Sequence, residues 1–359
     1  MHDDSDIRSI DQVPSTPPAS PADRAPTIHD VAHAAGVSSG TVSRYLNGHK
    51  WVGGASADAI REAIEQTGYR RNRFARSLAT GRSSTVVFLL TEPQDRLFGD
   101  PNYPVLLREI TTALADRGMT LVLMTASEDD ERRRVMDFVR GGHINGVLLV
   151  SSHLDDPMTG ELAAASVPTV SCGRPIGWES TIASVSADDR AGARAATEHL
   201  IGLDRRRVGI ITGPLDIGGA IDRLDGYRDA LAAAGIPFDT ALVATGDWLN
   251  VSGREAMTEL LASAPDIDAV FASNDLMASG AMTALRIAGR VVPDEVAVVG
   301  FDDSGLAATT DPPLTTMRQP FAEISREMVR LLAERVPGEA PAVSLPAHLI
   351  VRDSTAAHR

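Results

Sequence analysis

Four side chains in the second half of the chain follow predicted strands and have the chemistry to hold a polyol. Arg223 and Asn274 offer N–H donors, and Asp302 offers acceptors for neighbouring hydroxyl groups. Trp248 offers an indole face to the apolar side of a pyranose ring. Taken singly, an Asn or Asp at a strand end is more often a turn residue or a helix cap. The four together favour a small-molecule site.

The elements that would position these groups are predicted from residue 85 onward, where apolar strands alternate with amphipathic helices. The predicted strands are 86–90, 120–124, 146–150, 169–172, 207–212, 241–245, 268–272 and 296–301. Helices predicted between them include 132–140, 190–201, 223–234 and 276–288. This alternation predicts α/β lobes built on two doubly wound parallel sheets. Ligands of such folds bind beyond the carboxyl ends of the strands, so the four groups would meet between the lobes.

A second segment with readable chemistry lies near the amino terminus. Thr27 can cap a short helix, Gly36 can end it, and Ser38 can cap a second helix that reaches about Asn47. Two short helices joined by a glycine-containing turn form the helix-turn-helix pattern. A third helix is predicted over residues 55–67. These features predict an all-α headpiece in front of the α/β lobes.

The second helix of this headpiece has one face suited to DNA. Val42 and Leu46 fall on the inner side, and the opposite side is polar. Arg44 can bond guanine O6 and N7 together in the major groove. Phosphate contacts are predicted for Thr41, Ser43 and Asn47. The predicted DNA-contacting set of the headpiece is Thr27, Ser38, Ser39, Gly40, Thr41, Ser43, Arg44 and Asn47. Viewed alone, the segment would be better interpreted as a solvated amphipathic helix.

Composition supports a DNA-binding segment attached to an acidic body. The net charge is −14, yet residues 27–82 carry +4 and the residues after them carry −15. A local basic surface can bind phosphates while the body avoids them. The single cysteine, Cys172, excludes an internal disulfide and a cysteine-based zinc site. No apolar run approaches the ~18 residues of a membrane span, so we expect a cytoplasmic, nucleoid-associated protein.

The run from Thr27 to Gly81 (TIHDVAHAAGVSSGTVSRYLNG … GYRRNRFARSLATG) closely resembles the LacI/GalR family of bacterial regulators. The resemblance implies that Ser39, Gly40 and Arg44 read bases. It also implies a hinge helix over residues 72–79 whose Leu78 wedges into the minor groove. The DNA-contacting residues expected in this segment are Asn72, Arg73, Ala75 and Leu78.

The resemblance extends to the predicted ligand site. Arg223 matches the effector arginine of R-x-x-G-(Y/F/W), Asn274 the asparagine of S-N-D, and Asp302 the first aspartate of G-(F/Y)-D-D. Trp248 matches a tryptophan that stacks on sugar in the family. Tyr103 lies where relatives place an aromatic residue at the cleft, with contact and packing equally open. Many relatives have an aspartate where this chain has Gly173, which leaves the identity of the sugar open.

The domains follow from these matches. We expect a disordered tail over residues 1–26, a headpiece over 27–71, a hinge over 72–83 and an effector domain over 84–359. The first lobe would comprise about 84–184 and 314–339, and the second about 185–313 and 340–359, with crossings near Ser184, Leu314 and Ala340. No leucine heptad follows residues 348–352, so we expect a homodimer on a pseudo-palindromic operator.

The predicted function is a DNA-binding transcription regulator, a repressor, whose operator affinity is controlled by a mono- or disaccharide. No cofactor or metal is expected. A purine or a phosphoprotein co-regulator is the alternative effector. An α/β enzyme is disfavoured, because the sequence has no P-loop, no G-x-S-x-G elbow and no metal-ligand spacing among its histidines. The choice between repressor and activator stays open, as does the choice between inducer and co-repressor.

Overall fold

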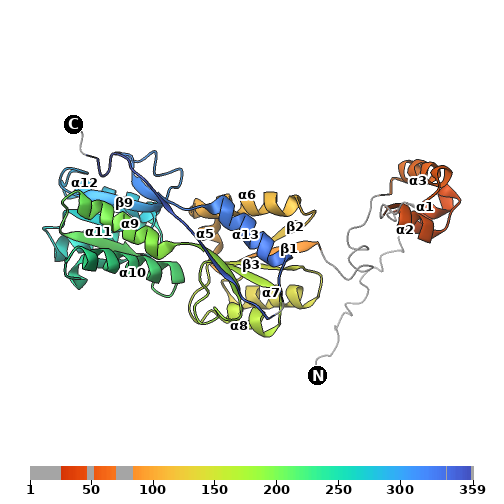
Figure 1. The fold of residues 1–359 in the computed structure, drawn as a ribbon, viewed down its shortest axis with the longest axis horizontal. Helices are drawn as coiled ribbons and strands as arrows, with labels where there is room; N and C mark the ends of the chain where they lie inside the picture. Colours follow the sequence, from red (N-terminus) through yellow and green to blue (C-terminus); the bar gives the residue numbers. More distant parts are fainter. Residues whose placement is uncertain (1–25, 47–51, 70–83, 337, 357–359) are drawn as a thin grey trace, which may run out of the picture. The chain divides into compact units, whose positions relative to one another are not determined.

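The computed structural model describes residues 26–46, 52–69, 84–336 and 338–356. The chain forms two compact units, residues 1–76 and 77–359 (Figure 1). Within the described residues, the first unit is helical and the second consists of two α/β lobes. None of the described helices is long and apolar enough to cross a membrane.

The first unit packs three helices around a small apolar core, as predicted. Its helices are α1 (Ile28–Ala35), α2 (Ser39–Leu46) and α3 (Gly54–Thr67). The backbone N–H and hydroxyl of Thr27 both donate to the Asp30 carboxylate at 2.7 Å, which fixes the start of α1. Gly36 ends α1 with φ of +63°, a conformation that glycine adopts without steric cost. Val42 of α2 is fully buried, so the helix presents its other side outward.

The first lobe of the second unit is a six-stranded parallel sheet covered by helices. Its strands are β1 (Thr85–Leu90), β2 (Thr120–Thr125), β3 (Gly146–Val150), β4 (Thr169–Cys172), β5 (Ala183–Ala187) and β11 (Ala342–Leu345), in the order β11-β5-β4-β3-β1-β2. Its helices are α5 (Gln94–Gly99), α6 (Asn102–Ala115), α7 (Asp129–Arg140), α8 (Pro157–Ala164) and α13 (Phe321–Ala333). β1 and β3 are almost entirely buried, as expected for strands covered on both faces.

The second lobe repeats this architecture. Its strands are β6 (Val208–Thr212), β7 (Val243–Thr245), β8 (Ala269–Ala272), β9 (Ala297–Asp302), β10 (Thr315–Arg318) and β12 (His348–Ile350), in the order β12-β10-β9-β8-β6-β7. All neighbours are parallel except β10 and β12. Its helices are α9 (Asp189–Gly202), α10 (Gly218–Ala233), α11 (Asn250–Ser263) and α12 (Asp275–Ile287), with a 3₁₀ turn over Thr240–Leu242. The predicted fold class is confirmed.

The chain passes between the lobes three times, and each crossing lies a few residues beyond its predicted position. β5 pairs with β4, so the first crossing follows Ala187 rather than Ser184. β10 pairs with β9 and belongs to the second lobe, although it was predicted in the first. β11 pairs with β5 and belongs to the first lobe, although it was predicted in the second. The strand partners therefore correct the lobe boundaries.

Candidate functional site

The five residues predicted to hold an effector lie in one cleft between the two lobes. Tyr103 enters from the first lobe, and the second lobe supplies Arg223, Trp248, Asn274 and Asp302. The cleft has a volume of about 160 Å³. Its lining also includes residues that the sequence reasoning did not single out: Asp100, Asn102, Ser151, Asp189, Gly219 and Gln319. Most of these also follow the carboxyl ends of strands, in agreement with the rule for parallel sheets.

Arg223 is a buried cation with a fixed orientation. It lies in the second turn of α10, because the helix begins at Gly218 and not at Arg223 as predicted. Its Nε donates to Asp189 Oδ1 at 2.8 Å, and its Nη1 donates to the carbonyl oxygen of Ser273. The guanidinium stacks on the ring of Phe301 at 3.8 Å. These contacts hold its remaining N–H groups in position at the cleft.

Asp189 is the most informative residue that the sequence reasoning missed. It opens α9 directly after β5, and its side chain is buried against Arg223. Burial raises the pKa of Asp189, while the charge of Arg223 lowers it. The strand-end rule would have found Asp189 if β5 had been predicted. Asp189 therefore belongs to the site, because it orients Arg223 as well as lining the cleft.

Asp302 ties the two lobes together at the centre of the cleft. Its carboxylate accepts from Asn102 Nδ2 of the first lobe at 2.7 Å and from Gln319 Nε2 of the second crossing at 2.6 Å. Burial raises the pKa of Asp302 well above its usual range, with a smaller opposing effect from Arg223. The backbone has φ of +114°, a conformation that non-glycine residues rarely adopt and that is enriched at active sites and ligand clamps.

Asn274 has a more structural role than predicted. Its Oδ1 accepts from the backbone N–H of Met277 at 2.8 Å and so caps α12. Its Nδ2 donates to the carbonyl oxygen of Trp248 at 2.9 Å. Both ends of the amide are therefore engaged with the protein. The residue fixes the loop that carries Trp248, which was the alternative role foreseen for a residue at a strand end.

Trp248 lies in a left-handed turn with φ of +74°. Its ring lies against Gly213, where an added Cβ would come within 2.1 Å of the indole. The Arg223 guanidinium lies 5.6 Å from the ring centroid. The indole can therefore occupy this position only because residue 213 has no side chain.

Gly213→Ala should therefore displace the indole and weaken sugar binding by roughly tenfold, with a stability loss of about 1–3 kcal/mol from overpacking. Calorimetric titration and urea unfolding would measure the two effects. Gly235→Ala is unsuitable as a control, because Gly235 has φ of +68° and alanine would be strained in that conformation. Gly202→Ala is suitable, because nothing lies within 4 Å of its added Cβ. Wild-type sugar affinity in Gly213→Ala would contradict the assigned position of the indole.

Tyr103 and Gly173 also line the cleft. Tyr103 packs on the first-lobe core while it lines the cleft, so both predicted roles are compatible with its position. Burial raises its pKa, and a hydrogen bond to Ser151 lowers it. Gly173 lines the cleft with φ of +92° and has nothing within 4 Å of an added Cβ. The chain thus has open space where relatives were expected to carry a carboxylate.

In the headpiece, the outward side of α2 carries the predicted DNA-reading residues. Gly40 and Arg44 are exposed. Ser39 Oγ lies 3.0 Å from Nδ1 of His29, which was not predicted to take part. Thr41 accepts a long hydrogen bond from Arg44 Nη2 at 3.5 Å. The predicted contacts Asn47, Asn72, Arg73, Ala75 and Leu78 lie outside the described residues.

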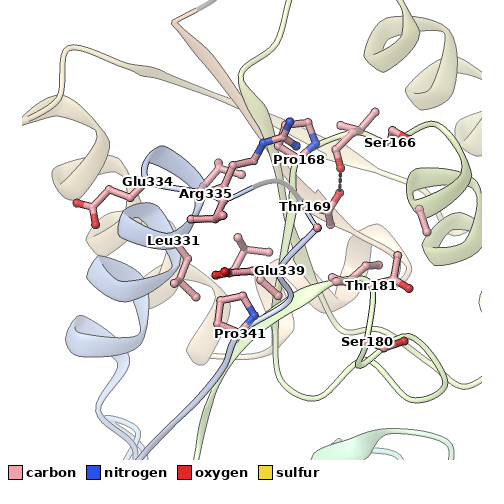
Figure 2. A pocket seen from close by; sticks show the side chains of 18 of the residues that line it. Ser166, Pro168, Thr169, Ser180, Thr181, Leu331, Glu334, Arg335, Glu339 and Pro341 are labelled. Carbon is pink, nitrogen blue, oxygen red and sulfur yellow. Dashed lines mark hydrogen bonds between the residues drawn. The ribbon is translucent and has the colours of Figure 1, made fainter.

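A larger pocket, of about 620 Å³, lies elsewhere in the first lobe. It is formed near the amino-terminal ends of β4 and β5 and the end of α13 (Figure 2). Arg335, Glu334 and Glu339 are among its polar lining groups, and none of the predicted site residues contributes to it. Because ligands of doubly wound folds bind at the carboxyl ends of strands, the smaller inter-lobe cleft is the better candidate site.

Comparison with known proteins agrees with this geometry. A family model described as bacterial regulatory proteins of the lacI family matches residues 27–72, and one described as a periplasmic binding protein-like domain matches residues 197–355. The chain is 44% identical to the HTH-type transcriptional regulator CelR of Thermobifida fusca, over 92% of this chain and 98% of that protein. The chain belongs to the LacI family of bacterial regulators. Its members regulate transcription and are not enzymes, so the enzyme alternative is set aside.

Other relatives of this LacI-family regulator are consistent with the assignment. It is 34% identical to the ribose operon repressor of Escherichia coli, over 86% of this chain and 93% of that protein. A CelR–cellobiose complex matches with a TM-score of 0.74 and 43% identity, over 92% of this chain and 99% of that one. A lac repressor dimer bound to operator and the anti-inducer ONPF matches with a TM-score of 0.81 and 27% identity, over 93% and 100% of the two chains.

Proposed function

We propose that this LacI-family regulator is a repressor that binds a neutral sugar of the cellobiose class between its lobes and changes its operator affinity in response. The observation that carries the proposal is the convergence of Arg223, Asp302 and Trp248 on one cleft. Arg223 supplies donors and Asp302 supplies acceptors to neighbouring hydroxyls, and Trp248 supplies an apolar face. Similarity to CelR, one of whose solved structures is a cellobiose complex, supports the choice of disaccharide.

The charge of the cleft favours a neutral ligand. Asp100, Asp189 and Asp302 line it, and Arg223 is the one basic residue among its lining groups. An anionic ligand such as a sugar phosphate would find only Arg223 to balance its charge, and Arg223 already pairs with Asp189, so burying the anion in this poorly solvated site is unfavourable. The same argument disfavours the phosphate group of a phosphoprotein as the group bound in the cleft. Neutral sugars meet no such penalty.

The dimensions of the cleft imply that it opens and closes. Its volume of about 160 Å³ is below the roughly 300–1,000 Å³ of typical small-molecule pockets. A disaccharide would therefore enter when the lobes separate, and the contacts between the lobes would form again as they close on it. Closure between two lobes is a common way of coupling ligand binding to a change elsewhere in a protein. This motion supplies the conformational change by which the effector domain would act on the headpiece.

DNA binding is proposed for a homodimer on a pseudo-palindromic operator. Within each headpiece, over residues 27–71, α2 would enter the major groove with Arg44 as the base reader. Residues 72–83 would form the hinge, with Leu78 in the central minor groove. Dyad symmetry of the operator requires two headpieces, and the effector domain over residues 84–359 would hold them together.

A thermal-shift screen of the purified protein tests the ligand class directly. The panel would contain cellobiose, other mono- and disaccharides, their phosphates and purine bases. A ligand at 100-fold above its dissociation constant adds about 2.7 kcal/mol of stability, which gives a readily measured shift. We expect a neutral disaccharide to stabilise the protein and the phosphorylated sugars to leave it unchanged. Stabilisation by a purine or a sugar phosphate alone would overturn the proposal.

A further inference from the structure

The rim of the cleft carries an ion pair that joins the loop after β4 to helix α10. Arg174 of the first lobe donates from Nη2 to Asp222 Oδ1 at 2.7 Å and from Nε to Asp222 Oδ2 at 3.2 Å. This two-bond geometry is the strongest form of an arginine–carboxylate contact. Gly218 lets the α10 terminus approach, since a Cβ there would meet the Arg174 carbonyl oxygen at 2.7 Å. The start of α10 is thereby attached to the first lobe.

A second contact lies beside it. Nδ1 of His153, after β3, lies 2.9 Å from Asp216 Oδ2 of the second lobe, and Nε2 lies 2.9 Å from Glu92 Oε1 of the first lobe. Both ring nitrogens face carboxylate oxygens, so both must carry protons and the ring is an imidazolium. The pKa of His153 is raised to about 9, chiefly by Glu92. The next amide, that of Leu154, donates to the carbonyl oxygen of Asp216 at 2.7 Å.

A third pair follows the same pattern. Arg96 of α5 lies 3.9 Å from Asp247, in the loop that carries Trp248. In all three pairs the cation belongs to the first lobe, and the carboxylate that it contacts across the cleft belongs to the second lobe. Figure 1 shows α5 on the side of the first lobe that faces the second. We call this set the clasp: Arg96, His153 and Arg174 with Asp247, Asp216 and Asp222.

We propose that the clasp holds the cleft closed and thereby makes the affinity for an uncharged sugar depend on ionic strength. The inference rests on the proposed function for its sugar readout. The lobe-crossing carboxylates are 30–52% exposed, so salt screens them, whereas Arg223 and Asp302 inside the cleft are shielded. Apparent affinity falls with the fraction of molecules in the binding-competent closed state. A neutral ligand has no charge of its own that salt could screen.

Calorimetric titration of cellobiose into the full-length protein at low and high salt tests this proposal. We expect wild-type affinity to fall about threefold or more between about 20 mM and about 500 mM NaCl. The double variant D216N/D222N should bind more weakly at low salt and show little further loss. The matched control is D225N/D229N, because these α10 carboxylates pair with Arg228 and Arg190 of their own lobe. The control should keep the wild-type salt dependence.

Hydrogen exchange at the Leu154 amide gives a readout that needs no sugar. This amide bridges the lobes, so exchange should quicken in D216N/D222N and at high salt, and stay at the wild-type rate in D225N/D229N. Salt-independent sugar affinity in wild type, or wild-type exchange in D216N/D222N, overturns the clasp. If no sugar binds wild type while exchange quickens in D216N/D222N, the clasp stands and the proposed ligand is wrong.

Discussion

Arg223→Ala is expected to weaken the affinity for cellobiose by about a hundredfold while the headpiece keeps its fold. The guanidinium is the one basic group among the lining residues of the cleft, and each charge-assisted hydrogen bond lost with it is worth about 1.5–3 kcal/mol. A sugar bound to the variant would leave buried hydroxyls unpaired, which adds to the loss. Calorimetric titration of the full-length protein measures the effect.

Two further variants test whether the hydrogen-bond geometry of the guanidinium is what matters. Arg223→Lys keeps the positive charge beside Asp189 but cannot reproduce the forked donor geometry, so it should also lose most of the affinity. Arg228→Ala is the matched control, because Arg228 lies on the same helix with its side chain 46% exposed and pairs with Asp225. We expect Arg228→Ala to bind sugar as wild type does. Full affinity in Arg223→Lys would show that charge alone matters and that the assigned hydrogen bonds do not.

Arg44→Ala should relax operator specificity at one base position by about 1–3 kcal/mol, which is the discrimination of a two-bond contact to guanine. Arg44 is exposed on α2 beside buried Val42, so its removal leaves the headpiece core intact. Competition binding with operator duplexes that carry each base at each position of a half-site would measure the change.

Arg61→Ala supplies the control for this experiment. Arg61 is an exposed arginine of α3 that pairs with Asp58 at 2.8 Å. Its removal should leave relative base preferences unchanged. If Arg44→Ala weakens binding equally across all duplexes, Arg44 contacts phosphate and another residue reads the base.

Local patterns in the sequence were enough to predict the headpiece. Helix periodicity decides which face of α2 is buried, and Val42 and Arg44 lie as that periodicity requires. Caps and turns are also local, which is why Thr27 and Gly36 delimit α1 as expected. Short-range sterics and hydrogen bonds determine all of these features, so neighbouring residues contain the information.

The lobe boundaries depended on information that neighbouring residues do not contain. β5 (ASVSA), β10 (TTMR) and β11 (AVSL) have few large apolar residues, so hydrophobic periodicity gives them little signal. Their sheet membership is decided by strands far away in the chain, as in the pairing of β11 with β5. Sequence patterns alone therefore located the crossings only approximately.

The site shows the same division between local and distant effects. The strand-end rule predicted that Arg223, Trp248 and Asp302 would meet, and all three line one cleft, because the rule follows from sheet topology. It missed Asp189 because β5, the weakly apolar strand that precedes this residue, was not predicted. The rule placed Asn274 at the cleft correctly. It did not predict that the side-chain oxygen of Asn274 caps α12 and is therefore already hydrogen-bonded.

The most direct test of the account is a reciprocal titration. Operator duplex selected in vitro would be titrated with protein at several cellobiose concentrations, and cellobiose would be titrated into protein with and without operator. Because coupling between two sites is reciprocal, both titrations must give the same coupling free energy, expected at about 1–3 kcal/mol. Equal coupling free energies that differ from zero would establish that sugar and operator binding are linked through one conformational equilibrium. Operator affinity that no concentration of bound sugar changes would contradict the central claim that the cleft controls DNA binding.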